Sequence, residues 1–427
     1  MSAHPASPPA PVSRSAPGGA AELPDHRRIG RQLGVFATEE SVGAGLPLWL
    51  PAGAAIRSAL EAFVIELERR HGYRHVHTPV LGKRELYERS GHWAHYRDDM
   101  YPPMGVGEEQ VVLRPMTCPH HVLVFQAERP ALDELPYRLA ELAPMFRYER
   151  SGVVGGLSRT RQMTLSDGHV FCTPEQIHDE ISDMLAMVGD AYDTLRIPRP
   201  RFRLSLRDDG PKFVDDDELW ARSEDALRSV LRAHDVDVVE APGEAAFYGP
   251  KIDLQVTDPR GRDETLSTIQ VDFHLPERFD LVARRGPERV RPVMIHRSIA
   301  STMERMVAHL LEVHDGALPP WLAPVQVRVL PIQPLPEGHL AAVRDAFFRR
   351  GLRVDVDGRD ATLGARIRQA RLDRVPWTAV IGPREAAGGT VALRLRSGEQ
   401  RPPAALASVA DALGALVDQR SPDLWPG

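Results

Sequence analysis

The clearest periodic patterns along the chain are helical. The pattern becomes helix-like from about Ala52: in AAIRSALEAFVIELERRHG (residues 54–72), apolar residues recur every three or four positions, and a stop is expected at Gly72. TPEQIHDEISDMLAMVGDAYDTL repeats the pattern after a threonine that can cap the helix. SIASTMERMVAHLLEVHDG is a third predicted helix and is closed by glycine. Each of these helices should bury one apolar face.

The segments between these helices favour strands. HVHTPVL is strand-like but contains Pro79, which suits an edge or an interface because proline cannot donate to a ladder. QVVLRPMTC is also strand-like. YRLAELAPMFRYERSG and RQMTLSDGHVFC predict two strands joined by the Gly/Ser-rich turn SGVVGGLS. In residues 201–297, strand and loop signals alternate and end in STIQVDFHLP and VRPVMIHRS.

A proline-rich hinge, PPWLAP at residues 319–324, precedes a change of pattern. Strand-like and helix-like segments then alternate: VQVRVLPI, LAAVRDAFFRRG, LRVDVDG, LGARIRQARLDR, WTAVIG and VALRLRSG. This alternation predicts a small mixed or parallel α/β sheet. We therefore expect a domain boundary near residue 320.

Composition supports a globular protein of two or three domains, since 427 residues are 42% hydrophobic and 26% charged. The first 24 residues, rich in proline and alanine, predict a disordered leader rather than a secretory signal. No apolar run is long enough for a transmembrane helix, so no membrane partner is expected. The only cysteines, Cys118 and Cys172, exclude a disulfide framework and favour a reducing, cytoplasmic location.

The formal net charge of −6 does not indicate a nucleic-acid-binding protein, although RNA often binds a local basic patch. The segment GRDATLGARIRQARLDR concentrates positive charge in the last quarter of the chain. Its arginines are Arg359, Arg366, Arg368, Arg371 and Arg374. From composition alone, a solvated helix face is the simpler interpretation.

Single residues carry weak chemical signals. Arg147 and Glu149 could form a surface ion pair, and Arg305 could be a solvated helix residue. Three further candidates are Cys118, His169 and His296. Because they lack the close spacing of metal ligands, packing is the more common explanation for residues of this kind.

The order of these features along the chain resembles the three-motif layout of class II aminoacyl-tRNA synthetases. A proline-containing strand follows a long helix, an Arg-x-Glu strand–turn–strand comes next, and a late strand leads into a helix that carries an arginine. The local strings are similar to those of threonyl-tRNA synthetases from about residue 25 to residue 420. They are DHRRIGRQL, SGHWAHYRDDMY, RPMTCPHH, FRYERSG, DGHVFCTPEQI, EAAFYGPKIDLQV, TIQVDFHLPERF, RPVMIHRSI, TMERM and WLAPVQV.

The resemblance implies an α/β protein with three parts. Residues 1–24 would be the leader. Residues 25–320 would form an α+β catalytic domain, with the antiparallel sheet of class II synthetases flanked by helices. Residues 321–427 would form an α/β anticodon-binding domain. The resemblance also implies a homodimer through the Pro79 region.

For ATP, the resemblance assigns roles to five residues. Arg147 would hold the α-phosphate and the substrate carboxylate, and Glu149 would hold the adenine end. Arg305 would lie against the γ-phosphate or the adenine face. Arg159 and Gln270 would also contact the nucleotide, which binds with Mg²⁺. A guanidinium suits such contacts because it pairs with phosphate oxygens and stacks on flat rings.

The resemblance also makes Cys118, His169 and His296 the ligands of one Zn²⁺ per subunit. Three protein ligands leave open positions for the amino and hydroxyl groups of threonine. Valine has nearly the same shape but no hydroxyl, so the metal would reject it.

Further residues would complete the amino-acid pocket. Asp167 would take the proton of the substrate hydroxyl or accept a hydrogen bond from it, and Tyr248 and Lys251 would line the pocket. His92 would lie near the terminal ribose and assist acyl transfer. A histidine packed beside Trp93 is the alternative for this position.

The C-terminal region implies tRNA as a partner. Glu385 and Arg394 match positions that contact anticodon bases, and Arg366 is a further candidate contact. Unpaired bases expose edges that such side chains can recognise. In this setting the arginine-rich segment favours RNA.

Several positions depart from the family pattern. Met163 stands where the family commonly has phenylalanine, and Leu165 where it commonly has glutamine. That glutamine helps to bind the carboxylate of the amino acid, which leucine cannot do. His120 stands where glycine is usual, and Ser301 stands at a position that usually holds a small residue. Both are expected to crowd the pockets for the amino acid and ATP. The short leader leaves no editing domain, so the resemblance implies either that a separate editing protein removes serine or that errors with serine are tolerated.

Three functions remain open from the sequence. The first is a threonine–tRNA ligase. The second is a specialised copy that tolerates an inhibitor or activates another β-hydroxy amino acid for biosynthesis. The third is a non-catalytic tRNA-binding relative, which is disfavoured because Arg147, Glu149, Arg305 and all three ligand positions are present.

Overall fold

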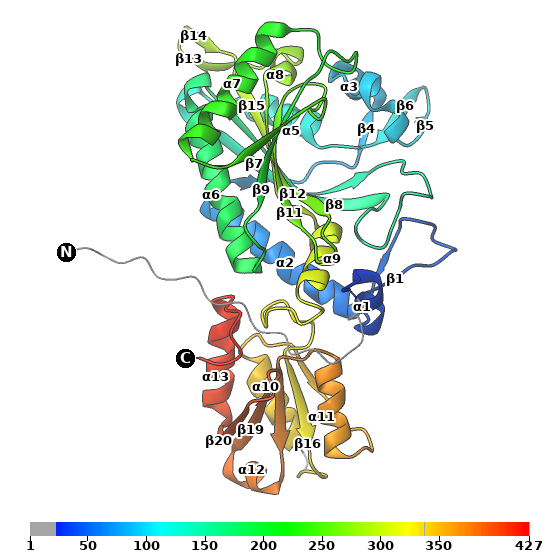
Figure 1. Cartoon of the computed structure of the whole chain (residues 1–427), viewed down its shortest axis with the longest axis vertical. Helices are drawn as coiled ribbons and strands as arrows, with labels where there is room; N and C mark the ends of the chain where they lie inside the picture. Colours follow the sequence, from blue (N-terminus) through cyan, green and yellow to red (C-terminus); the bar gives the residue numbers. More distant parts are fainter. Residues whose placement is uncertain (1–22, 337, 427) are drawn as a thin grey trace, which may run out of the picture.

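The computed structural model describes residues 23–336 and 338–426, so residues 1–22 of the predicted leader lie outside it. Figure 1 shows a large sheet-and-helix unit above a smaller one. None of the helices in the described ranges is both long and apolar enough to cross a bilayer.

An eight-stranded sheet forms the centre of the large unit. Its order is β10 (Val238–Pro242), β9 (Arg201–Leu206), β11 (Lys251–Thr257), β12 (Asp263–Asp272), β15 (Val293–Thr302), β8 (Gln162–Cys172), β7 (Tyr137–Phe146) and β3 (Arg74–His75). The inner neighbours are antiparallel, whereas the outermost pairs β10–β9 and β3–β7 are parallel. The antiparallel sheet expected for a class II synthetase is therefore confirmed.

Three helices supply much of the core beside this sheet: α2 (Pro51–Arg70), α6 (Ile177–Leu195) and α9 (Met303–Val313). Their apolar stripes bury Leu60, Met184 and Met306 together with Ile295 of β15. The helix predicted from about Ala52 and the helix predicted after Thr173 are both present.

A charged pair is enclosed in this core. The Arg297 Nη1 atom of β15 donates to the Glu68 Oε1 atom of α2 over 2.6 Å, and both side chains are fully buried. The Arg297 guanidinium also lies 4.2 Å from the centre of the Tyr73 ring. Gly168 of β8 leaves the room for it, because a Cβ there would lie 2.3 Å from Arg297 Cζ. The pair therefore links β15 to α2, with Gly168 of β8 leaving the space for it.

Three predictions of local structure were wrong. Residues 298–302 extend β15 rather than starting a helix, because Ser298 and Thr302 pair with β8, and α9 begins only after the Thr302 cap. In HVHTPVL only the two ends form ladders, β3 and β4 (Leu81–Lys83); Pro79, which has no N–H, lies between them.

The third error is the missed helix α7 (Asp217–Ala233). Its start is fixed by Asp216, which accepts from Leu219 N over 2.9 Å. The many charged residues on its outer face obscured the apolar stripe, which is buried at Trp220 and Leu227.

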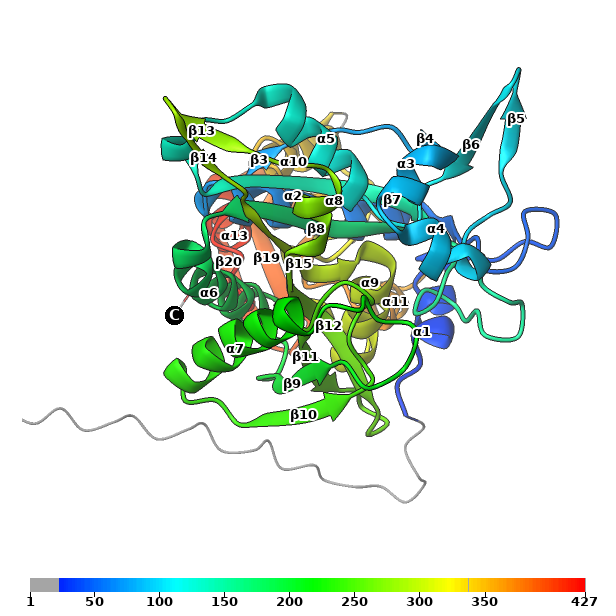
Figure 2. The same ribbon diagram turned by 90° about the horizontal axis from the view of Figure 1, so that it is seen from above.

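Smaller elements surround the sheet, and Figure 2 shows β4, β5 and β6 standing to one side with α3 and α4 nearby. The helices are α1 (His26–Gln32), α3 (Arg84–Arg89), α4 (His92–His95), α5 (Cys118–Glu128) and α8 (His274–Arg278). The strands are β1 (Phe36–Ala37), β2 (Leu48–Trp49), β5 (Met104–Val106), β6 (Glu109–Leu113), β13 (Ala283–Arg285) and β14 (Glu288–Val290). Three 3₁₀ turns are η1 (Arg97–Asp99), η2 (Leu132–Glu134) and η3 (Pro174–Gln176).

The smaller unit is built on a second, mixed sheet. Its order is β17 (Val354–Val356), β16 (Val327–Pro331), β18 (Trp377–Ile381), β19 (Thr390–Leu395) and β20 (Gln400–Ala405). Its helices are α10 (His339–Phe348), α11 (Leu363–Leu372), α12 (Pro383–Gly388) and α13 (Leu406–Asp418). The mixed α/β sheet predicted here is confirmed. Trp321 and Leu322 still pack in the first core, whereas Val327 belongs to the second.

Candidate active site

A cavity of about 530 Å³ opens over the central sheet. It is lined from β7, β8, β11, β12, β15 and α9, and from the loop of residues 147–161. It brings together eleven of the residues selected from the sequence: Cys118, Arg147, Glu149, Arg159, Asp167, His169, Tyr248, Lys251, Gln270, His296 and Arg305.

One side of the cavity carries an arginine cluster, formed by Arg147, Arg159 and Arg305. Arg159 Nη2 lies 2.9 Å from Glu149 Oε2, and Arg305 Nε donates to Ser158 O over 3.2 Å. Burial lowers the pKa of Arg305, and the charges of Arg147 and Arg159 lower it further. Because neighbouring guanidinium groups repel one another, the cluster favours a polyanion such as a triphosphate.

The same cavity holds a ligand triad, Cys118, His169 and His296, whose ligand atoms lie within 4.8 Å of one another. His169 Nε2 is 3.0 Å from His296 Nδ1, because the two residues are paired in register on β8 and β15. Burial raises the pKa of the Cys118 thiol and lowers that of His169.

The outer nitrogens of both triad histidines are held by groups that the sequence analysis missed. His296 Nε2 lies 2.8 Å from Asp272 Oδ2, and His169 Nδ1 lies 2.8 Å from His121 Nδ1. This leaves the inner nitrogens directed at each other. One thiol and two imidazoles, each imidazole braced from behind, fit the donor set of a zinc site with open positions. His121 belongs to the string RPMTCPHH, but nothing in the sequence indicates that its side chain contacts His169.

His92 lies behind the triad instead of lining the cavity. Its ring is fully buried, with Nε2 3.3 Å from Cys118 Sγ and Nδ1 2.8 Å from Ser90 Oγ. Burial is the main cause that lowers the pKa of His92 to about 3. The Phe247 ring, 5.6 Å away and nearly perpendicular, packs against it. Its role beside a ribose stays a prediction.

The three residues predicted to bind the amino acid are polar and hydrogen-bonded. Asp167 is buried, which raises its pKa, and it accepts from the Thr117 hydroxyl. Tyr248 OH donates to Gln270 Oε1 over 3.1 Å. Lys251 Nζ donates to the Asp253 carboxylate over 2.8 Å.

The departures from the family pattern divide in two. Met163, Leu165 and Ser301 line the cavity, as expected. His120 does not, so the prediction that it crowds the pocket was wrong. Two residues correspond to about 200° around a helix, so His120 points away from Cys118 on α5. Its ring lies 6.3 Å from that of Tyr87, and burial lowers its pKa to about 4.

Ser301 adopts a left-handed backbone conformation, with φ at 52°. Since an L-residue is strained there, Ser301→Gly is expected to stabilise the fold by about 0.5–1 kcal/mol, measured by urea unfolding. Ser298→Gly, at an ordinary position of the same strand, is the control and should lower stability. A loss of stability in both variants would contradict the prediction.

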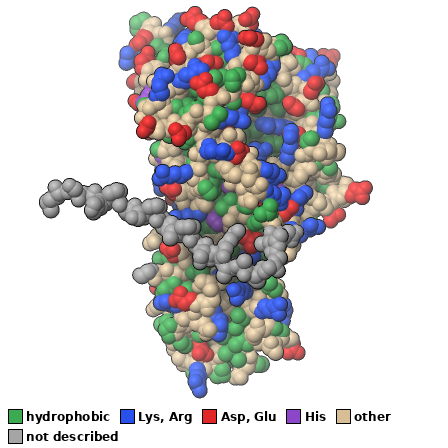
Figure 3. All heavy atoms as spheres, in the orientation of Figure 1, with side chains coloured by type: hydrophobic (Ala, Val, Ile, Leu, Met, Phe, Trp, Pro, Cys, Tyr) green, Lys and Arg blue, Asp and Glu red, His purple; other side chains and the backbone are tan. Residues whose placement is uncertain are grey.

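The predicted anticodon residues lie on the smaller unit. Arg366 of α11 is buried and donates through Nη1 to Asp357 O over 2.9 Å. Glu385 of α12 accepts from Gly382 N over 2.9 Å, and Arg394 lies opposite Thr378 in the β18–β19 ladder. Arg366 and Glu385 thus hold local backbone in this structure. Figure 3 shows basic and acidic side chains mixed across the visible face, rather than one acidic field.

Comparisons with known proteins agree with this architecture. Residues 105–314 match the tRNA synthetase class II core domain (G, H, P, S and T), and residues 326–416 match an anticodon binding domain. The chain is 48% identical over 382 residues to a threonine–tRNA ligase of Bacillus velezensis, covering 88% of this chain and 59% of the relative. Threonine–tRNA ligase 1 of Bacillus subtilis is also 48% identical, with the same coverage. The chain thus spans about three fifths of the length of these curated relatives.

Solved structures give the same picture. The RNA binding domain of threonyl-tRNA synthetase from Cryptosporidium parvum superposes with a TM-score of 0.87 at 35% identity, covering 92% of this chain and 98% of that one. A putative threonyl-tRNA synthetase from Aeropyrum pernix gives a TM-score of 0.80 at 27% identity, covering 94% and 97%.

Proposed function

The chain belongs to the threonyl-tRNA synthetase family of class II aminoacyl-tRNA synthetases, and from this we propose that it activates threonine with ATP and transfers it to the 3′ end of threonine tRNA. One observation carries the proposal: the arginine cluster and the ligand triad face the same cavity. A polyanion and a small polar amino acid can therefore meet there.

In the activation step, a threonine carboxylate oxygen attacks the α-phosphorus of ATP, and pyrophosphate leaves. Arg147 holds the α-phosphate and the carboxylate, while Arg159 and Arg305 hold the rest of the triphosphate. Glu149 receives the adenine end, and Gln270 contacts the nucleotide. Negative charge grows on phosphate oxygens in this step, so fixed guanidinium groups stabilise it, together with the Mg²⁺ that accompanies ATP.

Selection of the amino acid is assigned to the ligand triad, which would hold one Zn²⁺. When bound there, zinc supplies open positions for the amino and hydroxyl groups of threonine. Asp167 is buried and takes the proton of the substrate hydroxyl or accepts a hydrogen bond from it, and Tyr248 and Lys251 line the pocket. Valine cannot fill the hydroxyl position, so it is rejected far more strongly than a purely apolar pocket would allow.

A specialised copy is the second candidate. Met163, Leu165 and Ser301 all line the cavity, so the departures from the family pattern fall where substrate or inhibitor would bind. Such an enzyme would tolerate an inhibitor or activate another β-hydroxy amino acid. A non-catalytic relative has no observation in its favour.

ATP–pyrophosphate exchange separates these functions. We expect exchange with threonine and slower exchange with serine. With valine, kcat/KM for exchange should be at least about 100-fold lower than with threonine. A larger rate with another β-hydroxy amino acid would favour the specialised copy. No exchange with any amino acid would contradict both enzyme functions.

Transfer to tRNA is tested by charging threonine tRNA. Arg394→Ala is expected to lower kcat/KM for tRNA about tenfold while leaving exchange unchanged, because one base contact contributes roughly 1–3 kcal/mol. Arg344→Ala, at an exposed position of α10, is the control. Equal charging by both variants would remove Arg394 from the anticodon contacts. The homodimer and the separate editing protein stay predictions.

A further inference from the structure

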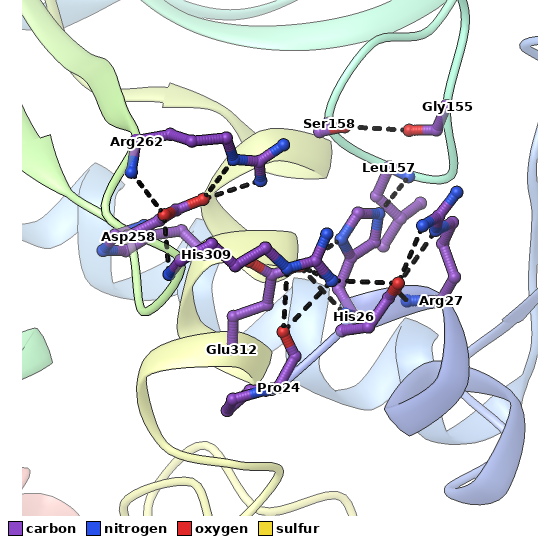
Figure 4. Close-up of polar contacts among 12 residues, drawn as sticks. Pro24, His26, Arg27, Gly155, Leu157, Ser158, Asp258, Arg262, His309 and Glu312 are labelled. Carbon is purple, nitrogen blue, oxygen red and sulfur yellow. Dashed lines mark hydrogen bonds and ion pairs between the residues drawn. The ribbon is translucent and has the colours of Figure 1, made fainter. Parts of the chain in front are cut away.

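His26, the first residue of α1, has a buried ring that lies between α9 and the loop of residues 147–161 (Figure 4). Its Nδ1 atom is 2.7 Å from Glu312 Oε1 of α9, and its backbone N–H donates to the same oxygen over 3.0 Å. On the other side of the ring, Leu157 N donates to His26 Nε2 over 3.2 Å.

These contacts fix the tautomer of the ring. A backbone N–H can only donate, so Nε2 must be the acceptor, and the ring proton then lies on Nδ1, where it faces Glu312. His26 therefore connects a carboxylate on α9 to the backbone of the loop by two directional bonds. A side chain without both a donor and an acceptor cannot make this connection.

Asp25, His26 and Glu312 lie close enough together to suggest a cation site. Two arginines already occupy that position, however: Arg27 Nη2 lies 2.7 Å and Arg260 Nη2 lies 2.9 Å from Asp25 Oδ2. The Asp25 carboxylate is thus neutralised by the two arginines, and the Nε2 lone pair of His26 already accepts from Leu157 N, so it is not available to a metal ion. The cluster is therefore better suited to holding the loop than to binding a metal.

Helix α9 holds the loop at two successive residues. Arg305 donates to Ser158 O directly, and Glu312 reaches Leu157 N through His26. Residues 305 and 312 are two helical turns apart and so share one face of α9. The loop turns tightly at this point, with Gly155 N donating to Arg159 O over 3.1 Å. The position of Arg159 thus depends on where α9 and His26 hold the turn.

Gly156 shows that the turn is shaped around the imidazole. Its φ of 52° lies in the left-handed region, and a Cβ there would lie 2.3 Å from His26 Nε2. Leu157, the next residue, buries its side chain completely in the main core. The ring and the turn therefore fit together without space for a further methyl group.

We propose that His26 is a positioning residue for ATP: it fixes the turn of residues 155–159, and with it Arg159 and the Arg305 contact, in the place where a triphosphate binds. This inference rests on the proposed function for its substrate. His26 does not touch the nucleotide; it determines whether the arginine cluster is assembled before ATP arrives.

The kinetic test compares His26→Phe with His26→Gln. Phenylalanine keeps the ring but loses both bonds, so KM for ATP in pyrophosphate exchange is expected to rise about tenfold, with KM for threonine within twofold. Glutamine has an acceptor and a donor and should recover most of the affinity. His178→Phe, at a half-exposed position of α6, is the control. Equal KM values for ATP in His26→Phe and wild type would overturn the proposal.

A second measurement does not depend on activity. Trypsin can cut the loop after Arg150, Arg159 and Arg161, and we expect these cuts to be faster in His26→Phe than in wild type or His178→Phe. If His26→Phe does not fold, Gly156→Ala displaces the imidazole without removing it and should accelerate the same cuts. Unchanged cleavage in the folded variants would overturn the proposal.

The two measurements also separate this inference from the proposed function. Wild-type protein that exchanges no amino acid, but whose loop is freed by His26→Phe, would contradict the function and keep the loop contact. Active wild-type protein whose KM for ATP and cleavage are insensitive to His26 would keep the function and reject the positioning role.

Discussion

Cys118→Ala is expected to lower the affinity for zinc at least about 100-fold and to abolish threonine-dependent pyrophosphate exchange. The remaining ligands would be two imidazoles 3.0 Å apart at their facing nitrogens, without the thiolate that neutralises part of the metal charge. Metal content by mass spectrometry and exchange with threonine and valine are the measurements.

Cys172→Ala is the matched control for this variant. Cys172 is the other cysteine of the chain; it is also fully buried, at the end of β8, but packs in the main core. It should keep its zinc and its threonine exchange, with some loss of stability from the smaller side chain. Full zinc occupancy in Cys118→Ala would show that the ligand assignment is wrong.

Arg305→Ala is the second large effect expected. Removing one member of the arginine cluster should lower kcat/KM for ATP by about 10²–10³, because a guanidinium fixed in a buried site stabilises transition-state charge without reorganising. KM for threonine should change little, since Arg305 is not one of the three residues of the ligand triad. Exchange kinetics with ATP as the varied substrate provide the measurement.

Arg305→Lys and Arg262→Ala complete the comparison. Lysine keeps the charge but cannot donate with the planar fork of arginine, so its activity should be intermediate. Arg262 pairs with Asp258 on the β11–β12 turn and is largely exposed, so its loss should leave exchange unchanged. Less than a threefold effect of Arg305→Ala would contradict a phosphate contact.

The sequence predicts the long periodic elements well and the contacts between distant segments poorly. The strand that ends before Arg147, the strand that contains Asp167 and the helices near Ala52 and after Thr173 follow from local patterns, and the structure contains them. The proximity of His169 and His296 depends on the β8–β15 register, which leaves no mark in sequence spacing. Only the family strings brought those two residues together.

His26 shows the limit of sequence reasoning most clearly. It stands in the string DHRRIGRQL, so it was visible from the start, yet its partners lie 131 and 286 residues away. Nothing local distinguishes a histidine that holds a distant loop from one that caps or packs. His120 illustrates the opposite error, because adjacency to Cys118 in the chain did not mean a place in the cavity.

The alternation along β8 has a consequence for how specificity can change. Met163, Leu165, Asp167 and His169 line the cavity, whereas Gly168 lies against the buried Arg297 on the other side of the strand. Residues that line the cavity and a residue that packs against the buried charged pair thus lie on opposite faces of one strand. Positions 163 and 165 can vary under selection, or in a designed library, without disturbing the charged pair, while position 168 cannot. The face of β8 that lines the cavity can therefore change in sequence while the face that packs on Arg297 stays the same.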